Sequence, residues 1–187
     1  MTEIVVIGGS AGSLQVLRNL LEAIPTHPTY TVVIVIHRLK NVLSDLSRIL
    51  SDNKTIREPL DKEPIKIGQI YLAPQNYHLL VESGRTFSLD YSEAVNFSRP
   101  SIDVTFESIA LTYGPTAVAI LLSGANDDGA SGITSILEKN GTAIVQDPDT
   151  AEYPAMPLAA IEKNKKISVH TPAFIAKYIS SLNLFKL

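Results

Sequence analysis

Short runs of apolar, mostly β-branched residues, separated by helical segments, restrict the fold of this 187-residue chain more than any other feature. Runs of this kind are typical of strands that are buried on both faces of a sheet. They occupy Ile4–Ile7, Thr31–Ile36, Thr116–Leu122 and Thr142–Gln146. Because parallel strands are joined by right-handed helical crossovers, the pattern predicts a doubly wound α/β fold: a mostly parallel sheet with helices on both faces, in a Rossmann-like three-layer sandwich.

The segments between these runs carry apolar residues at three- and four-residue spacing, which predicts helices. The expected helices are Leu14–Ile24, Leu39–Leu50, a segment from Ile102 that ends at Gly114, Gly129–Lys139, Met156–Lys163 and Pro172–Leu182, and a late strand is expected at Ile167–Val169. The middle of the chain alternates polar and apolar residues and turns at Ser83-Gly84. This pattern predicts an antiparallel β-hairpin, Tyr77–Val81 with Arg85–Leu89, beside a strand at Gln69–Ala73. Since no linker or repeat interrupts this order, we expect residues 1–187 to form a single domain.

Composition excludes several classes of protein. The chain has no cysteine, which excludes disulfides, thiol catalysis and thiolate zinc sites. The formal net charge of -3 argues against broad nucleic-acid binding, which usually needs a basic excess. No stretch approaches the roughly 20 apolar residues of a membrane helix, and no signal peptide precedes the first strand. We therefore expect a cytoplasmic protein that neither inserts into a membrane nor binds nucleic acid.

Three side chains with catalytic potential follow three of the predicted strands. Ser10 follows the first strand, His37 follows the second, and one of the aspartates Asp127 and Asp128 would follow the strand Thr116–Leu122. The carboxyl ends of parallel strands meet at one edge of the sheet, and ligands bind there in open α/β folds. A serine, a histidine and an aspartate are the nucleophile, the base and the orienting carboxylate of serine hydrolases. The sequence therefore predicts a candidate hydrolase site at this edge.

The glycine-rich turn around Ser10 has more than one explanation. Gly8-Gly9-Ser10-Ala11-Gly12 fits the G-x-S-x-G pattern, which places a nucleophile on a sharp turn between a strand and a helix. Alternatively, Ser10 caps the following helix, or the turn binds the phosphates of a nucleotide. The dinucleotide pattern would need glycine where Ser10 and Ser13 stand and an acidic residue where His37 stands, so it fits less well. Binding of an anion at this turn stays open.

The acidic pair Asp127 and Asp128 also has alternatives. An aspartate at a helix start commonly caps the helix, whereas one carboxylate of the pair could orient a histidine, and the spacing alone does not decide. A metal on the pair is a third interpretation, but no further cluster of acidic residues accompanies it, and we expect neither a metal nor a cofactor. The remaining histidines, His27, His78 and His170, are expected to be structural or surface residues.

Six segments together resemble the catalytic domain of the chemotaxis protein-glutamate methylesterases, the CheB family. They are "VVIGGSAGS" (Val5–Ser13), "VVIVIHRL" (Val32–Leu39), "IYLAPQNYHLLV" (Ile70–Val81), "RPSIDVTFES" (Arg99–Ser108), "LLSGANDDGASG" (Leu121–Gly132) and "AEYPAMPLAAI" (Ala151–Ile161). The resemblance implies a serine esterase that uses no cofactor and hydrolyses glutamate γ-methyl esters on the cytoplasmic helices of methylated chemoreceptors. The products would be methanol and glutamate, and many members also deamidate receptor glutamines. The resemblance assigns Ser10 as the nucleophile, His37 as its base and Asp128 as the carboxylate that orients the histidine.

The chain departs from the usual motifs of this family near the serine and the aspartate. Ala11 stands where threonine is usual and Gly12-Ser13 replaces a glycine pair, while Ala125 and Asn126 stand where methionine and glycine are usual. The residues expected to shape the oxyanion site and the substrate groove are Ala11, Gly12, Ala125, Arg99 and Met156.

Two further expectations concern regulation and the rival function. The typical family member carries a receiver domain before the catalytic domain, whereas this chain starts at the first catalytic strand, so control by a receiver domain is not expected. The alternative from a different class is a non-catalytic module on the same fold that binds a nucleotide, an anion or a receptor.

Overall fold

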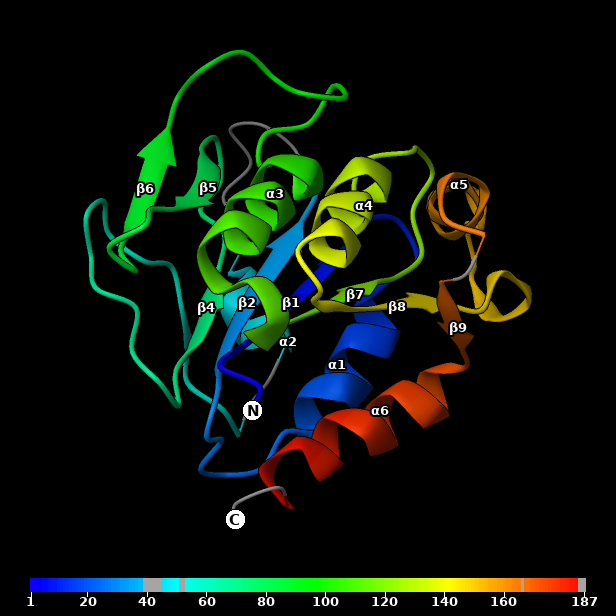
Figure 1. Ribbon diagram of the computed structural model, residues 1–187, viewed down its shortest axis with the longest axis horizontal. Helices are drawn as coiled ribbons and strands as arrows, with labels where there is room; N and C mark the ends of the chain where they lie inside the picture. The colour runs from blue at the N-terminus through cyan, green and yellow to red at the C-terminus, as the bar shows by residue number, and fades with distance from the viewer. Residues whose placement is uncertain (39–44, 51–52, 166, 185–187) are drawn as a thin grey trace.

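A computed structural model describes residues 1–38, 45–50, 53–165 and 167–184 of the chain (Figure 1). Its centre is a seven-stranded sheet in the order β3-β4-β2-β1-β7-β8-β9, in which every pair is parallel. The strands are β1 (Ile4–Gly9), β2 (Thr31–Ile36), β3 (Ile56–Arg57), β4 (Ile70–Leu72), β7 (Ala117–Leu121), β8 (Thr142–Gln146) and β9 (Ser168–His170). The predicted doubly wound α/β fold is confirmed.

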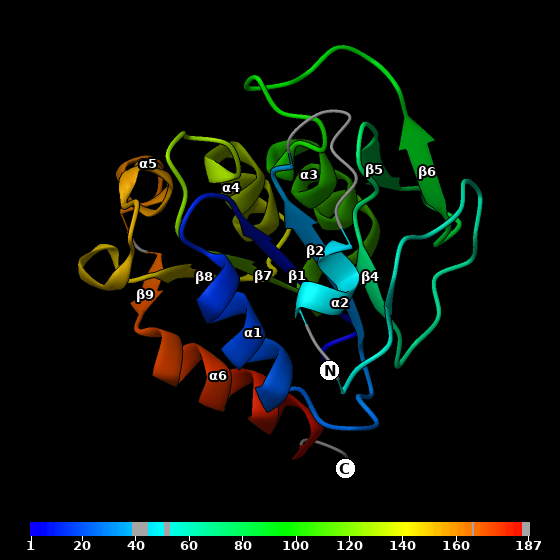
Figure 2. The same cartoon turned by 180° about the vertical axis from the view of Figure 1, so that it is seen from behind.

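Helices cover both faces of this sheet. Helices α1, α2 and α6 pack on one face and α3, α4 and α5 on the other, as Figures 1 and 2 show from opposite sides. Their bounds are α1 Leu14–Ala23, α2 Leu46–Leu50, α3 Ile102–Tyr113, α4 Ala130–Glu138, α5 Ala155–Lys163 and α6 Pro172–Ser181, with 3-10 turns at Gly114–Thr116, Pro148–Thr150 and Leu182–Leu184. None of the helices in the described ranges is long and apolar enough to cross a membrane.

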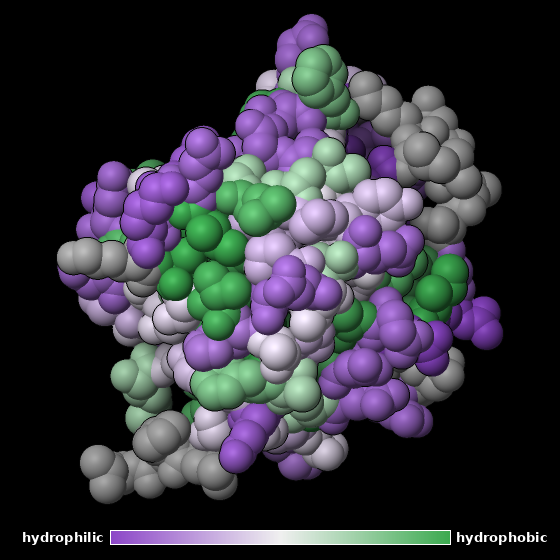
Figure 3. Space-filling model, turned by 90° about the vertical axis from the view of Figure 1, so that its right-hand side faces the viewer, coloured by the Kyte–Doolittle hydropathy of each residue, from purple (hydrophilic) through white to green (hydrophobic). Residues whose placement is uncertain are grey.

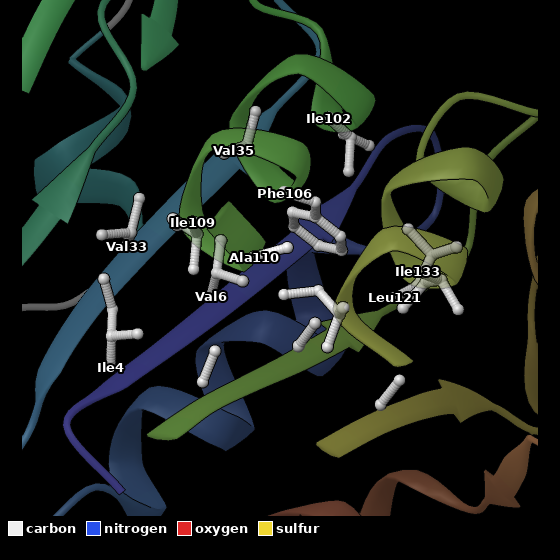
Figure 4. Close-up of a cluster of buried hydrophobic side chains, with 14 of the residues drawn as sticks. Ile4, Val6, Val33, Val35, Ile102, Phe106, Ile109, Ala110, Leu121 and Ile133 are labelled. Atoms are coloured by element: carbon white, nitrogen blue, oxygen red, sulfur yellow. The ribbon is translucent and has the colours of Figure 1, made fainter. Parts of the chain in front are cut away.

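The hydrophobic core is divided into two layers by the sheet. Alternate residues of a strand point to opposite faces, so Ile4 and Val6 of β1 join the core under α3 and α4, whereas Val5 and Ile7 join the core under α1 and α6. Figure 4 shows the first layer, in which Phe106 of α3 lies over the strands. On the side that carries α5 and β9, hydrophobic and hydrophilic residues are mixed at the surface, as is usual for soluble folds (Figure 3).

The predicted hairpin is present and forms a separate sheet. Strands β5 (His78–Val81) and β6 (Phe87–Asp90) pair antiparallel in a sheet of their own. The predicted strand at Gln69–Ala73 is observed as β4, which pairs with β2 in the main sheet and lies beside the hairpin, where the rings of Tyr71 and Phe87 are 4.7 Å apart. Strand β3 was not predicted, since two residues give no readable periodicity. Of the predicted helix Leu39–Leu50, the part Leu46–Leu50 is observed as α2, and residues 39–44 lie outside the described residues.

Candidate active site

The candidate site lies where the order of the strands reverses. After β1 the chain adds β2, β3 and β4 on one side, and then returns to add β7, β8 and β9 on the other side. Ser10 directly follows β1, and its backbone N–H donates to the carbonyl of Ser123 beyond β7 at 2.9 Å. His37 directly follows β2, and its backbone N–H donates to the carbonyl of Gly9 at 3.3 Å. Ser10 and His37 therefore occupy neighbouring positions at the carboxyl edge, where doubly wound folds bind ligands.

The turn that carries Ser10 is held by Ser13. The hydroxyl of Ser13 donates to the carbonyl oxygen of Ser10 at 2.7 Å, and helix α1 starts only at Leu14. The alternative in which Ser10 caps this helix is therefore wrong, because the cap position belongs to Ser13. Gly12 has a φ of 74°, and a Cβ there would lie 2.6 Å from the Cβ of Glu152, so both conformation and space require glycine.

The backbone N–H groups of Ala11 and Gly12 lie in the turn directly after Ser10. No hydrogen bond joins either group to another of the residues that the structure describes, and Ala11 is exposed. Two adjacent free N–H groups beside a serine hydroxyl are suited to hold a negatively charged oxygen.

His37 and Asp128 form a close pair. The Nε2 atom of His37 lies 2.7 Å from Oδ2 of Asp128, and the side chains are 12% and 0% exposed. Because an ionised carboxylate can only accept, Nε2 must carry the hydrogen of this bond. In the neutral imidazole Nδ1 is then unprotonated, which leaves it able to accept a proton. The pair thus fixes the tautomer that a general base needs.

Asp128 is a buried carboxylate that is fully hydrogen bonded. It accepts five hydrogen bonds, and its donors are His37 Nε2 (2.7 Å), the N–H groups of Ile102 (2.7 Å) and Asp103 (3.1 Å), Ser101 Oγ (2.8 Å) and Asn96 Nδ2 (3.2 Å). Burial by itself would raise the pKa of Asp128, but the hydrogen bonds from His37 and from the first turn of α3 outweigh it, and the pKa lies below its usual value. The carboxylate therefore stays ionised at neutral pH. It caps α3, and not the helix that follows it in the sequence.

A second carboxylate, that of Asp103 in α3, accepts hydrogen bonds from the start of α4. Its Oδ1 accepts the N–H groups of Gly129 at 2.9 Å and Gly132 at 2.7 Å, which lie at the start of α4. Helix α3 thus supplies the cap of α4, while the residue before Gly129 supplies the cap of α3. Asn96 joins the two carboxylates, because its Nδ2 lies 3.0 Å from Asp103 and 3.2 Å from Asp128. Burial raises the pKa of Asp103, and the charge of Asp128 adds to this effect.

Sequence reasoning missed Asn96 and Asp103. A signal for Asp103 was present, since it stands two residues after the serine that opens a predicted helix, but the target of its side chain depends on how two helices pack. Nothing in the sequence indicated Asn96, because its contacts join a loop to residues far along the chain.

Two other predicted site residues, Met156 and Arg99, have structural contacts of their own. Met156 is fully buried, and its Sδ would lie 2.6 Å from a Cβ at Gly124, so it supports the backbone just before the exposed Ala125. Arg99 donates to the carbonyls of Tyr91 and Ser92, and its guanidinium stacks over the Tyr91 ring at 4.0 Å from the ring centre. Met156 is thus a core residue, while Arg99 organises the loop before α3.

The histidines His78 and His170, which were expected to be structural or surface residues, contact neighbouring parts of the fold. His78 is buried, accepts the N–H of Ser101 through Nδ1 at 3.1 Å and contacts the carbonyl of Glu93 through Nε2 at 2.9 Å. His170 stacks on Phe174 with ring centres 3.8 Å apart. Within the described ranges, no group of three or more histidine, aspartate or glutamate side chains is placed to hold a metal ion.

Fold and site together define a doubly wound α/β domain that carries the residue set of a serine hydrolase at its switch point. The family model described as CheB methylesterase matches residues 5–179, and the chain belongs to the CheB methylesterase family. The crystal structure of the Thermotoga maritima CheB methylesterase catalytic domain superposes with a TM-score of 0.89 at 29% identity, over 97% of this chain and 99% of that one.

Similar sequences carry related names. A Leptospira interrogans protein, provisionally named a protein-glutamate methylesterase/protein-glutamine glutaminase, is 46% identical over 162 residues, which cover 86% of this chain and 84% of that protein. A Thermotoga maritima protein of the same name without the proviso is 31% identical over 166 residues, 86% of this chain and 48% of that protein. The chain therefore spans most of the first relative and about half of the second.

Proposed function

We propose that this chain is a protein-glutamate methylesterase whose nucleophile is Ser10, whose base is His37 and whose orienting carboxylate is Asp128. The observation that carries the proposal is the part-buried bond of 2.7 Å between His37 and Asp128, beside the strand end that carries Ser10 on a tight turn. The names of the relatives support the substrate class, a γ-methyl ester of glutamate in a protein. The substrate protein is a methylated chemoreceptor, met in the cytoplasm, and residues 1–187 act as one catalytic domain.

The reaction starts with proton transfer from Ser10. Nδ1 of His37 takes the hydroxyl proton while Oγ attacks the ester carbonyl, and Asp128 stabilises the imidazolium that forms. The carbonyl oxygen gains a negative charge, which the N–H groups of Ala11 and Gly12 bind. His37 then gives its proton to the departing methoxide, so methanol leaves and an acyl-enzyme remains on Ser10.

Water completes the cycle. His37 removes a proton from a water molecule that attacks the acyl-enzyme, and then returns this proton to Ser10 Oγ as the ester bond to the serine breaks. The product is the free glutamate side chain. The same steps applied to a glutamine side chain release ammonia in place of methanol, in keeping with the second half of the names of the relatives.

The test follows methanol released from a methylated receptor fragment. Ser10→Ala is expected to lower kcat on the order of 10⁴-fold or more, as for removal of a nucleophile. Ser83→Ala, at the exposed turn of the hairpin, is the matched control and is expected to keep full activity. Near-normal turnover by Ser10→Ala would overturn the mechanism, and a serine-directed covalent probe that labels Ser10 only when His37 is intact would support it.

A further inference from the structure

The loop between β6 and α3 ends in an unusual tip. In Figures 1 and 2 this segment arches over the top of the molecule. Val95 and Ser98 bond to each other in both directions, at 3.1 and 2.9 Å, and the two residues between them have φ angles of 49° for Asn96 and 61° for Phe97. Two successive positive φ values are the geometry of a type I′ turn, in which Asn-Gly is the preferred pair. Here Phe97 takes the position at which glycine is preferred.

Phe97 gains nothing from the fold in return. Its side chain is 99% exposed, so it buries no apolar surface, and a bulky residue is unfavourable in the left-handed region. Both the exposure and the backbone conformation therefore work against stability. An exposed aromatic residue on a fixed turn is typical of the anchors that protein interfaces use.

The tip is attached to the candidate active site. The side chain of Asn96 donates to Asp103 and to Asp128, at 3.0 and 3.2 Å, and its carbonyl accepts the side-chain amide of Asn126 at 3.4 Å. Through Asn96, the position of Phe97 is set by the same carboxylate that holds His37.

The base of the loop is also ordered by side chains. Tyr91 and Tyr77 contact each other with ring centres 5.5 Å apart, and the guanidinium of Arg99 lies over the Tyr91 ring while it donates to the loop backbone. Both tyrosines are exposed.

We propose that Phe97 is a specificity-determining residue that packs against the helical receptor segment carrying the methyl ester. The inference rests on the proposed esterase function. A substrate helix whose ester reaches Ser10 must pass the edge of the site, and Phe97 stands on the loop that is joined to this edge through Asn96. A small ester without a protein surface has nothing to place against Phe97.

The test compares two substrates and one binding reaction. kcat/KM is measured for a methylated receptor fragment and for an N-acetyl glutamate γ-methyl ester, and Kd for the fragment is measured in the Ser10→Ala protein. Phe97→Ala is expected to lower the ratio of the two kcat/KM values about 10- to 100-fold, mainly through KM, and to weaken Kd similarly, as for loss of an interface anchor. Phe97→Gly keeps the left-handed turn and is expected to give the same loss without a lower Tm. Leu111→Ala, on a residue 74% exposed near the far end of α3, is the matched control and leaves the ratio unchanged.

The outcomes separate this inference from the proposed function. An unchanged ratio and Kd in both Phe97 variants overturn the inference, as does absence of fragment binding by the Ser10→Ala protein. Equal loss on both substrates also overturns it, because the change then acts through Asn96 and Asp128. A wild-type protein that releases no methanol from either ester refutes the proposed function, while the Kd comparison still decides the role of Phe97.

Discussion

Replacing Asp128 with asparagine perturbs the proposed site at a single atom. The amide keeps the shape of the carboxylate but turns one acceptor oxygen into a donor. If the NH₂ group took the place of Oδ1, it would face the hydroxyl of Ser101, the N–H of Asp103 and the side-chain amide of Asn96. If it took the place of Oδ2, it would face the N–H of Ile102 and Nε2 of His37. The first orientation would leave two donors, the amide of Asn96 and the N–H of Asp103, without this acceptor. The second leaves only the N–H of Ile102 without its acceptor, because the imidazole can change from donor to acceptor, so it is the less costly orientation.

This orientation sets both expected magnitudes. The N–H of Ile102 loses its acceptor in a buried place, which costs about 1–3 kcal/mol of the free energy of unfolding. For a chain of this size, each kcal/mol lowers Tm by about 2–4 °C. The hydrogen of His37 moves to Nδ1, so this atom no longer accepts the proton of Ser10, and kcat falls on the order of 10⁴-fold.

Three measurements check Asp128→Asn. They are the rate of methanol release, Tm, and the nitrogen chemical shifts of the His37 ring, which report the protonated nitrogen. The matched control is Asp127→Asn at the exposed neighbouring carboxylate, with stability expected within about 0.5 kcal/mol of the wild type and full activity. A kcat within tenfold of the wild type, or a ring that keeps its hydrogen on Nε2 in the variant, would refute the reasoning.

Three further changes test other parts of the structure. Gly12→Ala places a Cβ at a φ of 74° and 2.6 Å from Glu152, so we expect a loss of about 1–3 kcal/mol in chemical denaturation and a lower kcat, and unchanged stability would contradict the assigned turn. The raised pKa of Asp103 means that the native state holds this proton more tightly than the unfolded chain, so its contribution to stability is lost as pH rises above about 4. In urea titrations across pH, the free energy of unfolding of Asp103→Asn should not show this decline with rising pH. The same decline in the variant would exclude Asp103 as its source. Burial raises the pKa of Tyr30 to about 12, and its hydroxyl donates to the carbonyl of Ile179 at 3.2 Å, so Tyr30→Phe should cost about 0.5–1.5 kcal/mol and remove one late step from the alkaline absorbance titration.

The mostly parallel sheet was predictable because β1, β2, β7 and β8 are buried on nearly every residue. Burial on both faces gives continuous apolar runs, and these are readable without any contact information. The features that the sequence did not predict are short strands or depend on pairing between strands. Strand β3 has two residues and was not predicted. Strand β4 was predicted at Gln69–Ala73, but its pairing with β2 is not specified by a local pattern.

The residues of the candidate site were predictable from the sequence, but the hydrogen bonds between them were not. Ser10 and His37 follow strands that are adjacent in the sheet, so strand assignment alone brought them near each other. The choice between Asp127 and Asp128 came from family resemblance, because both could equally cap a helix. The structure gives the physical difference, since Asp128 turns into the first turn of α3 while Asp127 is exposed. Such a contact between segments 26 residues apart leaves no trace in local spacing.

The central place of β1 has a consequence for the order of events during synthesis. β1 pairs with β2 on one side, and its other neighbour is β7, which begins at Ala117. The residue that pairs with Ile4 on this side is therefore more than half a chain length away in the sequence. Until that segment leaves the ribosome, one edge of the strand that leads to Ser10 is open, and the nascent chain has no Asp128 to hold His37. Late closure of long-range strand pairs slows folding and leaves edges that can associate wrongly. Esterase activity on a stalled nascent chain is therefore expected to appear only once residues 117–128 are free to fold, because the pairing of β7 with β1 closes the open edge of β1 and brings Asp128 to His37.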